Sequence, residues 1–353
     1  MMKKFFALTL ALLLVLGLAA CGGPAAASPS PSVAPTETPA PTPTADPNVR
    51  TRVNLMVLSG PTGVGAAKLL ADNDAGLTVN DYTVTVAAAN DEITAKLISG
   101  EADIAALATN VASNLYHKTG GAIQIAALNT LGVLHILERG GPTVRTMAGL
   151  KGKTLYAVGQ GANPEYVLNY LLTQNGLDPA KDVEIVWKTA EEVTALMLSG
   201  EAKLCMLPEP AATALVAKAK ASGQADAAVS RVLDLTEEWQ EVTDESVLTM
   251  GCMVVRTQFA KENPAAVNAF LTEYAASIDY VTGNVEEAAE LVAQYKIAPS
   301  AAIAQQAIPG CNLVCITGEE VRDRIQGYYE VLYAANPASI GGSIPDDAFY
   351  YLP

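Results

Sequence analysis

Short apolar runs alternate with longer segments of helical composition along most of the chain. The run Arg52–Leu58 (RVNLMVL) ends in Ser-Gly-Pro-Thr-Gly, which is typical of a buried strand followed by a turn. The segment Ile93–Ser99 has helical composition and stops at Gly100. Strands that alternate with helices predict βαβ units around a parallel sheet. The expected strands are 52–58, 82–88, 103–107, 123–128, 154–158, 183–187, 204–207 and 247–255, and the expected helices are 64–73, 93–99, 110–118, 163 onward, 193–199, 263–281, 286–295, 301–308 and 318–335.

One pattern of fifteen residues occurs twice. ITAKLISGEADIAAL spans Ile93–Leu107, VTALMLSGEAKLCML spans Val193–Leu207, and seven of the fifteen positions are identical. Each copy predicts a helix, a turn at Ser-Gly-Glu and a strand, and the elements around both copies come in the same order. We therefore expect two similar α/β lobes; the alternative is two unrelated turns that happen to agree. One departure between the copies is Lys203, which stands where the first copy has Asp103.

Three helix starts carry recognisable capping signals. Asn163-Pro164-Glu165 combines a capping side chain, a proline at the first helical position and an acid beside the positive helix end. Thr189–Glu192 and Thr317–Glu320 both have the Thr-x-x-Glu form of a capping box. Most of the segment from 263 to 335 has helical composition, so the chain should end in a cluster of helices.

The first residues, MMKKFFALTLALLLVLGLAAC, have the pattern of a secretory signal. Lys3 and Lys4 give a basic start, and the apolar run Phe5–Ala20 is shorter than the roughly 20 residues that a membrane-spanning helix needs. The LAAC sequence at 18–21 resembles the lipobox of bacterial lipoproteins, which implies cleavage before Cys21 and lipidation of its sulfur. The alternative is an ordinary signal peptide with an incidental cysteine.

Residues 21–48 are composed mainly of Pro, Ala, Thr and Ser. Such a segment cannot bury enough apolar surface to offset its ordering entropy, and its prolines favour an extended, semi-rigid tether. The net charge of the chain is −15, which argues against nucleic acid as a partner. Residues 49–353 are long enough for two lobes.

The remaining cysteines are Cys205, Cys252, Cys311 and Cys315. Export permits disulfides, and Cys311 could pair with Cys315 if the segment between them is not a regular helix. Cys205 and Cys252 lie in apolar stretches and are expected to be buried thiols. Because the chain has only two histidines, we expect neither a metal site nor a cofactor.

Five segments resemble the substrate-binding proteins of ABC importers, in the group that binds sulfonates, nitrate and thiamine precursors. They are RVNLMVLSGPTGVGAAKLL, ITAKLISGEADIAAL, LKGKTLYAVGQGANPEYVLNYLLTQNGLDPAKDVEIV, LPEPAATAL and TMGCMVVRTQFAKENPAAVNAFL. The resemblance covers most of residues 49–280, and Lys203 departs from the family's pattern at the position of Asp103. The segment 336–353 has no role that the sequence assigns.

This resemblance implies a type II periplasmic-binding-protein fold, with two similar α/β lobes, a two-strand hinge and a helical C-terminal tail that packs on the first lobe. The crossings would lie near 132–139 and 247–256. We expect a signal peptide at 1–20, a tether at 21–48, lobe 1 at 49–134 plus 254–353, and lobe 2 at 135–253. The protein would be lipid-anchored on the outer face of the cell membrane, and it would deliver a small molecule to an ABC permease and its ATPase.

The candidate ligand-binding residues lie on the loops that follow the strands. Helix amino ends in these loops attract anions or polar oxygens through backbone N–H groups. Each loop also has a purely structural interpretation, as a plain turn or a helix cap, and Glu209 could accept hydrogen bonds from a ligand or simply favour a helix start. The candidates are Ser59, Gly60, Pro61, Thr62, Thr109, Asn110, Gln160, Gly161, Asn163, Glu209, Thr249 and Met250.

Two further residues are ambiguous. Trp239, in an acidic segment expected to be a loop, could stack on a ring or cover apolar surface, and His135 is expected to be structural. Few basic residues lie in the candidate loops, which argues mildly against a strongly anionic ligand. A sulfonate, a vitamin precursor or a related heterocycle all remain open.

Other functions fit the sequence less well. Gly60 and Gly65 have Walker spacing, but Ala66 and Ala67 stand where Lys and Ser or Thr are required, so a nucleotide loop is not indicated. No Gly-x-Ser-x-Gly or His-Glu-x-x-His pattern occurs. The alternatives are an enzyme on the same fold, resembling pyrimidine synthases of thiamine biosynthesis, and a sensory binding lipoprotein.

Overall fold

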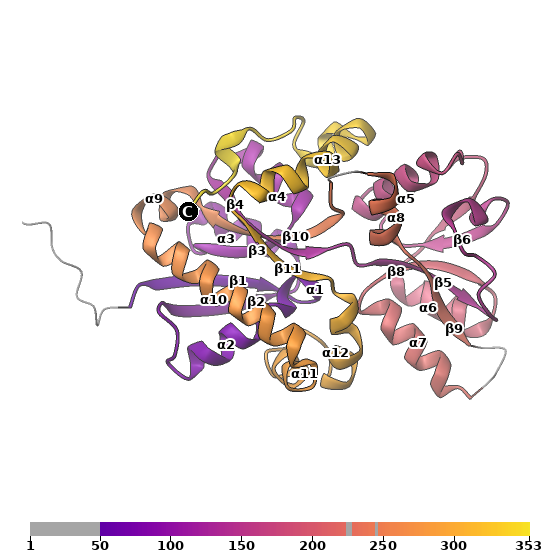
Figure 1. Cartoon of the computed structure of the whole chain (residues 1–353), viewed down its shortest axis with the longest axis horizontal. Coiled ribbons are helices and arrows are strands. Elements are labelled where there is room, and N and C mark those ends of the chain that lie inside the picture. The colour runs from indigo at the N-terminus through magenta and orange to yellow at the C-terminus, as the bar shows by residue number, and fades with distance from the viewer. Residues whose placement is uncertain (1–49, 224–227, 244–245) are drawn as a thin grey trace, which may run out of the picture. The chain divides into compact units, whose positions relative to one another are not determined.

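The structure is a computed structural model that describes residues 50–223, 228–243 and 246–353. Its strands form two sheets, which lie in separate lobes in Figure 1. The predicted signal, Cys21 and the tether lie outside the described residues. The strands of the first sheet, in spatial order, are β11 (Leu313–Thr317), β4 (Ile123–Leu131), β10 (Thr249–Arg256), β3 (Ile104–Ala108), β1 (Arg52–Leu58) and β2 (Asp81–Ala87). Those of the second are β7 (Glu184–Trp187), β6 (Thr154–Ala157), β8 (Leu204–Pro208), β5 (Leu134–Arg139) and β9 (Val229–Asp234).

Both sheets are mixed rather than wholly parallel, which corrects the prediction from the sequence. β1 pairs in parallel with β2 and β3, and β6 pairs in parallel with β7 and β8. The strand that enters each sheet from the other lobe runs the opposite way: β10 is antiparallel to β3, and β5 is antiparallel to β8. Each sheet thus contains a three-stranded parallel unit that pairs with a strand arriving from the other lobe.

The chain crosses between the lobes twice. It passes from β4 to β5 through Gly132 and Val133, and it returns from α8 (Leu235–Val242) to β10. Thr249 pairs with Leu131, so β10 lies wholly in the first sheet. Residues 249–253, which we expected in lobe 2, therefore belong with the first sheet. Below, lobe 1 denotes the first sheet with its helices, and lobe 2 denotes the second sheet with its helices.

Helices cover the faces of both sheets (Figure 1). In lobe 1, one apolar cluster is enclosed against β1 and β10 by the helices α2 (Ala67–Asp74), α10 (Pro264–Gly283) and α11 (Val285–Gln294). In lobe 2, another is enclosed by α6 (Ala190–Ser199) and α7 (Ala211–Ala221). The remaining α-helices are α1 (Pro61–Val64), α3 (Asn90–Ser99), α4 (Thr109–Thr119), α5 (Asn163–Gln174), α9 (Thr257–Glu262), α12 (Ala301–Ala307) and α13 (Glu319–Ala335). Short 3-10 turns lie at η1 (Met147–Leu150), η3 (Ile308–Gly310), η4 (Pro337–Ile340) and η5 (Asp347–Phe349). Among the described helices, none is long and apolar enough to cross a membrane.

The repeated pattern folds as predicted, once in each sheet. The first copy is α3 followed by β3 and the second is α6 followed by β8. Gly100 and Gly200 end the two helices with φ of 78° and 87°, in the left-handed region that glycine adopts without steric cost. Because the copies sit in separate sheets, the prediction of two similar α/β lobes is confirmed.

The helical tail contacts both lobes, although we predicted contact with lobe 1 alone. Tyr328 of α13 lies with its ring centroid 6.1 Å from that of Trp239 in lobe 2, and Trp239 in turn lies 4.9 Å from Tyr170 of α5. On the lobe 1 side, the Tyr329 hydroxyl donates to the carbonyl of Thr109 over 2.9 Å. An apolar cluster therefore runs without interruption from one lobe to the other.

The C-terminal segment 336–353, to which the sequence assigned no role, is hydrogen-bonded to lobe 1. Ser113 Oγ of α4 donates to the carbonyl of Ile340 over 2.7 Å. The N–H of Tyr351 donates to the carbonyl of Ile125 over 2.9 Å. These bonds hold the end of the chain against α4 and β4.

Several local predictions are confirmed and others are wrong. Thr189 and Glu192 form the reciprocal capping box. The matching box at Thr317 does not form, because Gly318, rather than Thr317, is the N-cap of α13 and no side chain caps the helix. Trp239 lies in α8 rather than in a loop, and it is fully buried. The sequence reading missed β9 and β11.

The four cysteines described are free thiols. Cys311 precedes β11 and Cys315 lies within it, so the segment between them is not a helix, yet no disulfide joins them. Cys205 and Cys252 are buried, as predicted. Burial raises the pKa of the Cys205 thiol to about 12, which keeps it protonated and unreactive at neutral pH.

Candidate functional site

The carboxyl ends of the parallel strands in each lobe lead into helices that begin at the boundary between the lobes. In lobe 1, β1 leads into α1 and β3 leads into α4, and in lobe 2, β6 leads into α5 and β8 leads into α7. Ligands of open α/β sheets bind outside this edge of the sheet, where helix amino ends offer unpaired N–H groups. Most candidate residues from the sequence lie on these connections.

The amino ends of α4 and α5 meet across the lobes. Asn163 Nδ2 donates to Asn110 Oδ1 over 2.9 Å and to the hydroxyl of Tyr328 over 2.7 Å. Burial raises the pKa of Tyr328, so that hydroxyl stays neutral. Asn163 is only 5% exposed, and its Oδ1 has no hydrogen-bond partner among the described residues. A buried acceptor without a partner costs free energy.

The predicted capping roles of these residues are not observed. Ala162 is the N-cap of α5 and Ala108 is the N-cap of α4, and neither helix has a side-chain cap. Asn163 is instead the first residue of its helix, and its amide is directed to the opposite lobe. The backbone N–H groups at both helix starts are therefore left without a side-chain acceptor.

A buried polar layer lies beneath this contact, at the start of β10. Thr249 and Thr109, both fully buried, have their Oγ1 atoms 3.4 Å apart. Gly251 follows, and a Cβ at this position would lie 2.7 Å from Asn129 Oδ1 and 2.8 Å from Thr62 Cγ2. Only glycine permits this approach of β10 to α1 and β4. Thr62, Thr109 and Thr249 are thus brought together, with Met250 half-buried beside them.

Sequence reasoning missed Asn129 and Thr130 in this layer. Asn129 Nδ2 donates to the carbonyl of Thr62 and to the hydroxyl of Tyr274, each over 2.9 Å. Asn129 Oδ1 and Thr130 Oγ1 are buried and have no partner in the described part of the chain. The signal was present, because IQIAALNT places two polar side chains at the end of an apolar run that leads into a crossing.

The other candidates lie apart from this layer. Ser59 is exposed, and its Oγ donates to the carbonyl of Ile297 over 3.2 Å, as does the N–H of Gly60 over 2.9 Å. Gln160 is exposed, and the N–H of Gly161 donates to Glu165 Oε2 over 2.6 Å. These loops form the rim of the boundary rather than its buried floor.

Gly60 and Pro61 also take part in a dry contact between the lobes. A cavity of about 10 Å³ separates them from Pro210 at the start of α7, and Ile308 and Cys311 close its other side. Such a space is too small and too apolar to hold a water molecule comfortably. It is a packing contact, and we assign it no ligand.

The carboxylate of Glu209 is fully inaccessible and already engaged. Arg231 Nη2 donates to Glu209 Oε1, and the N–H of Thr213 donates to Oε2 over 3.2 Å. A Cβ at Gly310, in lobe 1, would lie 3.0 Å from Oε1, so Glu209 sits under the opposite lobe. Ligand binding by Glu209 stays a prediction, and any ligand would have to share the carboxylate with Arg231.

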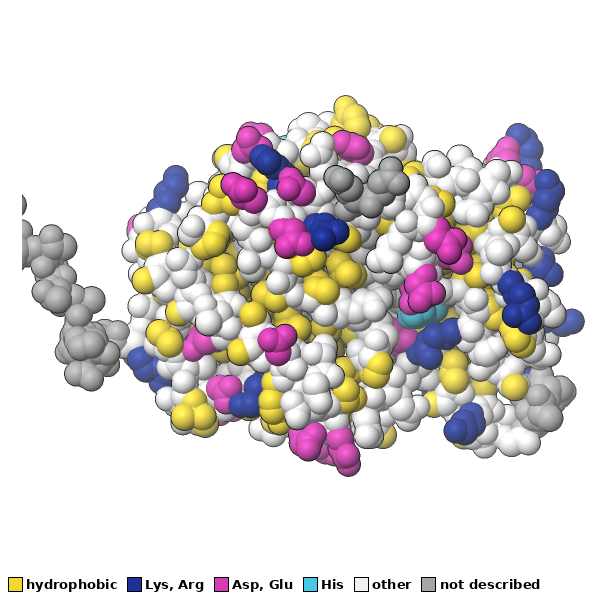
Figure 2. Space-filling model, viewed as in Figure 1, with side chains coloured by type: hydrophobic (Ala, Val, Ile, Leu, Met, Phe, Trp, Pro, Cys, Tyr) yellow, Lys and Arg dark blue, Asp and Glu magenta, His cyan; other side chains and the backbone are white. Residues whose placement is uncertain are grey.

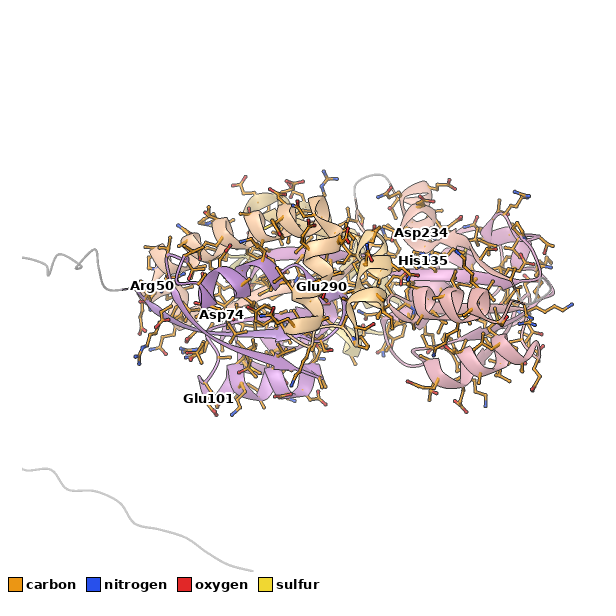
Figure 3. All side chains as sticks on the ribbon, turned by 90° about the horizontal axis from the view of Figure 1, so that it is seen from below. Arg50, Asp74, Glu101, His135, Asp234 and Glu290 are labelled. Atoms are coloured by element: carbon orange, nitrogen blue, oxygen red, sulfur yellow. The ribbon has the colours of Figure 1, made fainter. Side chains whose placement is uncertain are left out.

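His135 lies beside Glu209 at the start of lobe 2. Figure 3 shows it next to Asp234, whose Oδ2 is 3.7 Å from His135 Nδ1, while Nε2 is 3.5 Å from Glu209 Oε1. Burial lowers the pKa of His135, and this effect outweighs the opposite effect of Asp234 and Glu209. The imidazole is thus a neutral structural group, in line with its predicted role.

Two α/β lobes that face each other through helix amino ends, joined by two crossings, define the type II periplasmic-binding-protein class of fold. The chain belongs to the NMT1-like family, whose model matches residues 59–297. The resemblance predicted from the sequence is thereby confirmed. A comparison with curated proteins finds no match.

Solved structures share the fold at low sequence identity. An ABC transporter protein from Parabacteroides distasonis is 24% identical, with a TM-score of 0.70 over 85% of this chain and 99% of that chain. The periplasmic aliphatic sulphonate binding protein SsuA from Escherichia coli is 16% identical, with a TM-score of 0.63 over 82% of this chain and 94% of that chain. The periplasmic nitrate-binding protein NrtA from Synechocystis is 14% identical, with a TM-score of 0.50 over 77% of this chain and 74% of that chain. These similarities establish the fold alone.

Proposed function

We propose that the protein is an extracytoplasmic solute-binding lipoprotein of an ABC importer and not an enzyme. It binds a small molecule between the lobes and presents it to a permease and its ATPase. The observation that carries the proposal is the meeting of α4 and α5 through Asn110 and Asn163, with the unpaired Asn163 Oδ1 between them. A solute that contacts both helix starts stabilises the closed arrangement by its contacts with each lobe.

The chemistry of this boundary favours a ligand with hydrogen-bond donors. Three buried oxygens lack a partner among the described residues: Asn163 Oδ1, Asn129 Oδ1 and Thr130 Oγ1. An amide oxygen can only accept, so it pairs with an N–H or O–H group. Within the classes predicted from the sequence, a vitamin precursor or related heterocycle with ring or amino N–H groups supplies such donors, whereas a sulfonate offers acceptors alone.

A thermal-shift screen of the full chain tests the binding role. The library contains sulfonates, amines, thiamine precursors and nucleobases, and a specific ligand at 100 times its Kd should stabilise the fold by about 2.7 kcal/mol. Asn163→Ala should reduce the shift, because it removes the contact of α5 with the solute and with lobe 1. Gln174→Ala, on an exposed position of the same helix, is the matched control and should keep the full shift.

The outcomes separate the possibilities. A ligand whose shift is lost in the Asn163 variant and kept in the control supports the proposal. A ligand whose shift is the same in both variants binds elsewhere and contradicts it. Conversion of the ligand by the purified protein would identify an enzyme instead.

The anchor is tested independently of the ligand. We propose that the protein is tethered to the outer face of the cell membrane through lipid on Cys21. Cys21→Ser should release the protein from the membrane fraction, because the acyl chains that hold it are no longer attached. Retention of this variant in the membrane after a high-salt wash would contradict lipid anchoring.

A further inference from the structure

The exchange of Asp103 for Lys203 between the two repeats falls at matching corners of the two sheets. In lobe 1, the N–H of Arg256 donates to the carbonyl of Asp103 over 2.8 Å. In lobe 2, the N–H of Arg139 donates to the carbonyl of Lys203 over 2.9 Å. Each arginine ends the strand that returns from the other lobe, and each lies beside the glycine that ends the repeated helix. The two corners are therefore built alike, with one substitution between them.

In the lobe 1 corner, the positive charge of Arg256 is compensated by the carboxylate of Asp103. Arg256 Nη2 donates to Asp103 Oδ1 over 2.8 Å, and Asp103 is 5% exposed. The other carboxylate oxygen accepts from the N–H and the side-chain amide of Asn54, over 3.0 and 2.9 Å. The carboxylate thus compensates the guanidinium and has its own partners, so this corner needs no external ion.

The lobe 2 corner has no such carboxylate. Arg139 Nη1 donates instead to the carbonyls of Met197 and Leu198, in the last turn of α6, over 2.9 and 3.1 Å. These bonds fix the guanidinium in place, but carbonyl dipoles do not cancel its charge. Lys203 adds a second positive charge at the position of Asp103, and Lys153, just before β6, adds a third.

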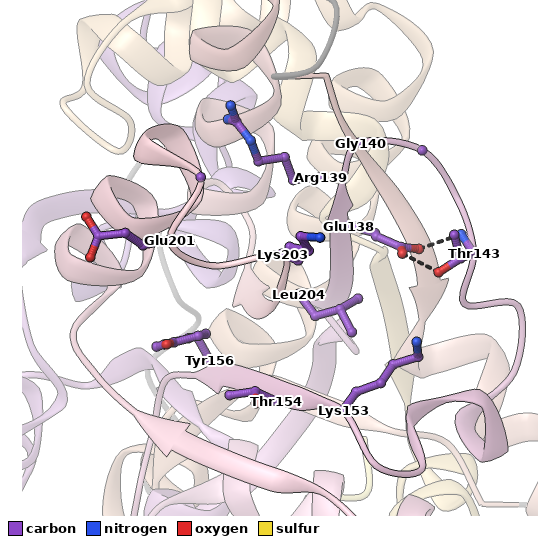
Figure 4. Close-up of a pocket in the computed structure, with 12 residues that line it drawn as sticks. Glu138, Arg139, Gly140, Thr143, Lys153, Thr154, Tyr156, Glu201, Lys203 and Leu204 are labelled. Atoms are coloured by element: carbon purple, nitrogen blue, oxygen red, sulfur yellow. Dashed lines mark hydrogen bonds between the residues drawn. The ribbon is translucent and has the colours of Figure 1, made fainter.

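These cations surround a hollow, shown in Figure 4, with a volume of about 690 Å³. Lys153 and Lys203 have no ion-pair partner in the part of the chain that the structure describes. Figure 2 shows further lysine and arginine side chains along this end of lobe 2. A gathering of positive charge is unusual in a chain whose net charge is −15.

Two acidic side chains, Glu138 and Glu201, also line the hollow. Glu138 accepts from the N–H groups of Thr143 and Val144, over 2.7 and 3.0 Å, and from the Thr143 hydroxyl. Although burial opposes its ionisation, these bonds and Lys153 hold the pKa of Glu138 below its usual value. Glu201 accepts from Ser199 and is directed away from Lys153 and Lys203 in Figure 4.

The balance of charge sets the class of ligand. Three cations and two carboxylates line the hollow, so one positive charge remains uncompensated among the described lining residues, and one of the carboxylates, Glu201, is directed away from the lysines. We propose that this pocket, lined by Arg139, Lys153 and Lys203, binds a phosphate dianion, either free or as a terminal phosphate ester. The anion takes the place beside Arg139 that the Asp103 carboxylate takes beside Arg256.

The pocket is distinct from the boundary between the lobes. It lies where β6 and β8 begin, whereas Asn163 and Glu209 lie where the same strands end. The proposal therefore does not depend on the solute that the lobes enclose.

Calorimetric titration of the full chain with inorganic phosphate tests the site, in a buffer of low ionic strength free of other oxoanions. The wild type should show saturable binding. Lys203→Asp should weaken it by about tenfold or more, because it replaces an attractive charge by a repulsive one and supplies Arg139 with the partner that Arg256 has. Lys261→Asp makes the same change in net charge on the exposed face of α9 and should leave the affinity unchanged.

Thermal unfolding of Lys203→Asp verifies that this variant is folded. Wild-type titrations that do not saturate, or a Lys203→Asp variant that binds phosphate as tightly as the wild type, would overturn the proposal. A glycerol phosphodiester, which carries a single charge, should bind more weakly than inorganic phosphate. Equal or tighter binding of the diester would overturn the assignment of a dianion.

Discussion

Asn163 of lobe 2 donates a hydrogen bond from Nδ2 to Oδ1 of Asn110 in lobe 1, over 2.9 Å. This bond joins the amino ends of α4 and α5. It is a direct side-chain link between the two halves of the predicted cleft.

Removing this link should favour opening of the lobes. Asn110→Ala breaks the bond and leaves the contact of Asn163 with Tyr328 intact. A net hydrogen bond contributes about 1 kcal/mol, so the ratio of open to closed molecules should rise roughly fivefold. Small-angle scattering should then give a larger radius of gyration than for the wild type or for Gln174→Ala. An unchanged radius would show that the link does not control closure.

Gly251 should tolerate no side chain, because β10 packs directly against α1 and β4. A Cβ would lie 2.7 Å from Asn129 Oδ1. Gly251→Ala should therefore destabilise the fold by about 1–3 kcal/mol, the usual cost of overpacking. Urea unfolding measures the change, and Gly283→Ala, where nothing lies within 4 Å of the added methyl group, is the control. Equal midpoints for the two variants would contradict the packing described.

The buried His135 should make stability fall as the solution becomes mildly acidic. Burial lowers its pKa in the folded state, so below its ordinary value of 6.5 the unfolded chain binds a proton that the folded chain does not. The contribution is fully present above pH 6.5 and is lost as the pH falls toward the folded-state pKa, at no more than about 1.4 kcal/mol per pH unit. The difference between wild type and His135→Gln in urea unfolding should show this slope. A difference that is flat between about pH 5 and 7 would mean that folding leaves the pKa of His135 at its ordinary value.

Trp239 should be a principal source of cohesion between lobe 2 and the tail helix. It is fully buried between Tyr170 and Tyr328. Trp239→Ala should cost about 3–5 kcal/mol, because it leaves a large cavity at a junction of three helices. Tyr333→Ala removes an aromatic ring that is 41% exposed on α13 and should change the unfolding free energy little. A small loss for Trp239→Ala would indicate that the tail packs loosely on lobe 2.

The elements with strong local signals were predictable. The repeat fixed two helix-turn-strand units because Gly100 and Gly200 each end a helix in a conformation that other residues avoid. The capping box at Thr189 formed as expected because it depends only on residues three apart. Short strands without such signals, β9 and β11, were missed, since edge pairing is decided by neighbours distant in sequence.

The candidate site was predictable only in part. The loops lie at the boundary between the lobes because strand ends and helix starts share one edge of a parallel unit. The hydrogen-bond partners of the candidate residues could not be predicted, because they come from remote segments. Asn163 donates to Asn110 of the other lobe instead of capping its own helix, and Glu209 accepts from Arg231. Asn129 was overlooked, although its place at the end of an apolar run that leads into a crossing was visible in the sequence.

The sequence by itself determined the two-lobed α/β architecture and the family, because both follow from local periodicity and from turns that repeat along the chain. The tertiary structure alone decided which buried polar atoms have a hydrogen-bond partner and which do not. It also revealed that exchanging Asp103 for Lys203 leaves Arg139 without a carboxylate. The physical reason is that charge compensation and hydrogen bonding are settled over a few ångströms in space, between residues that the chain keeps far apart.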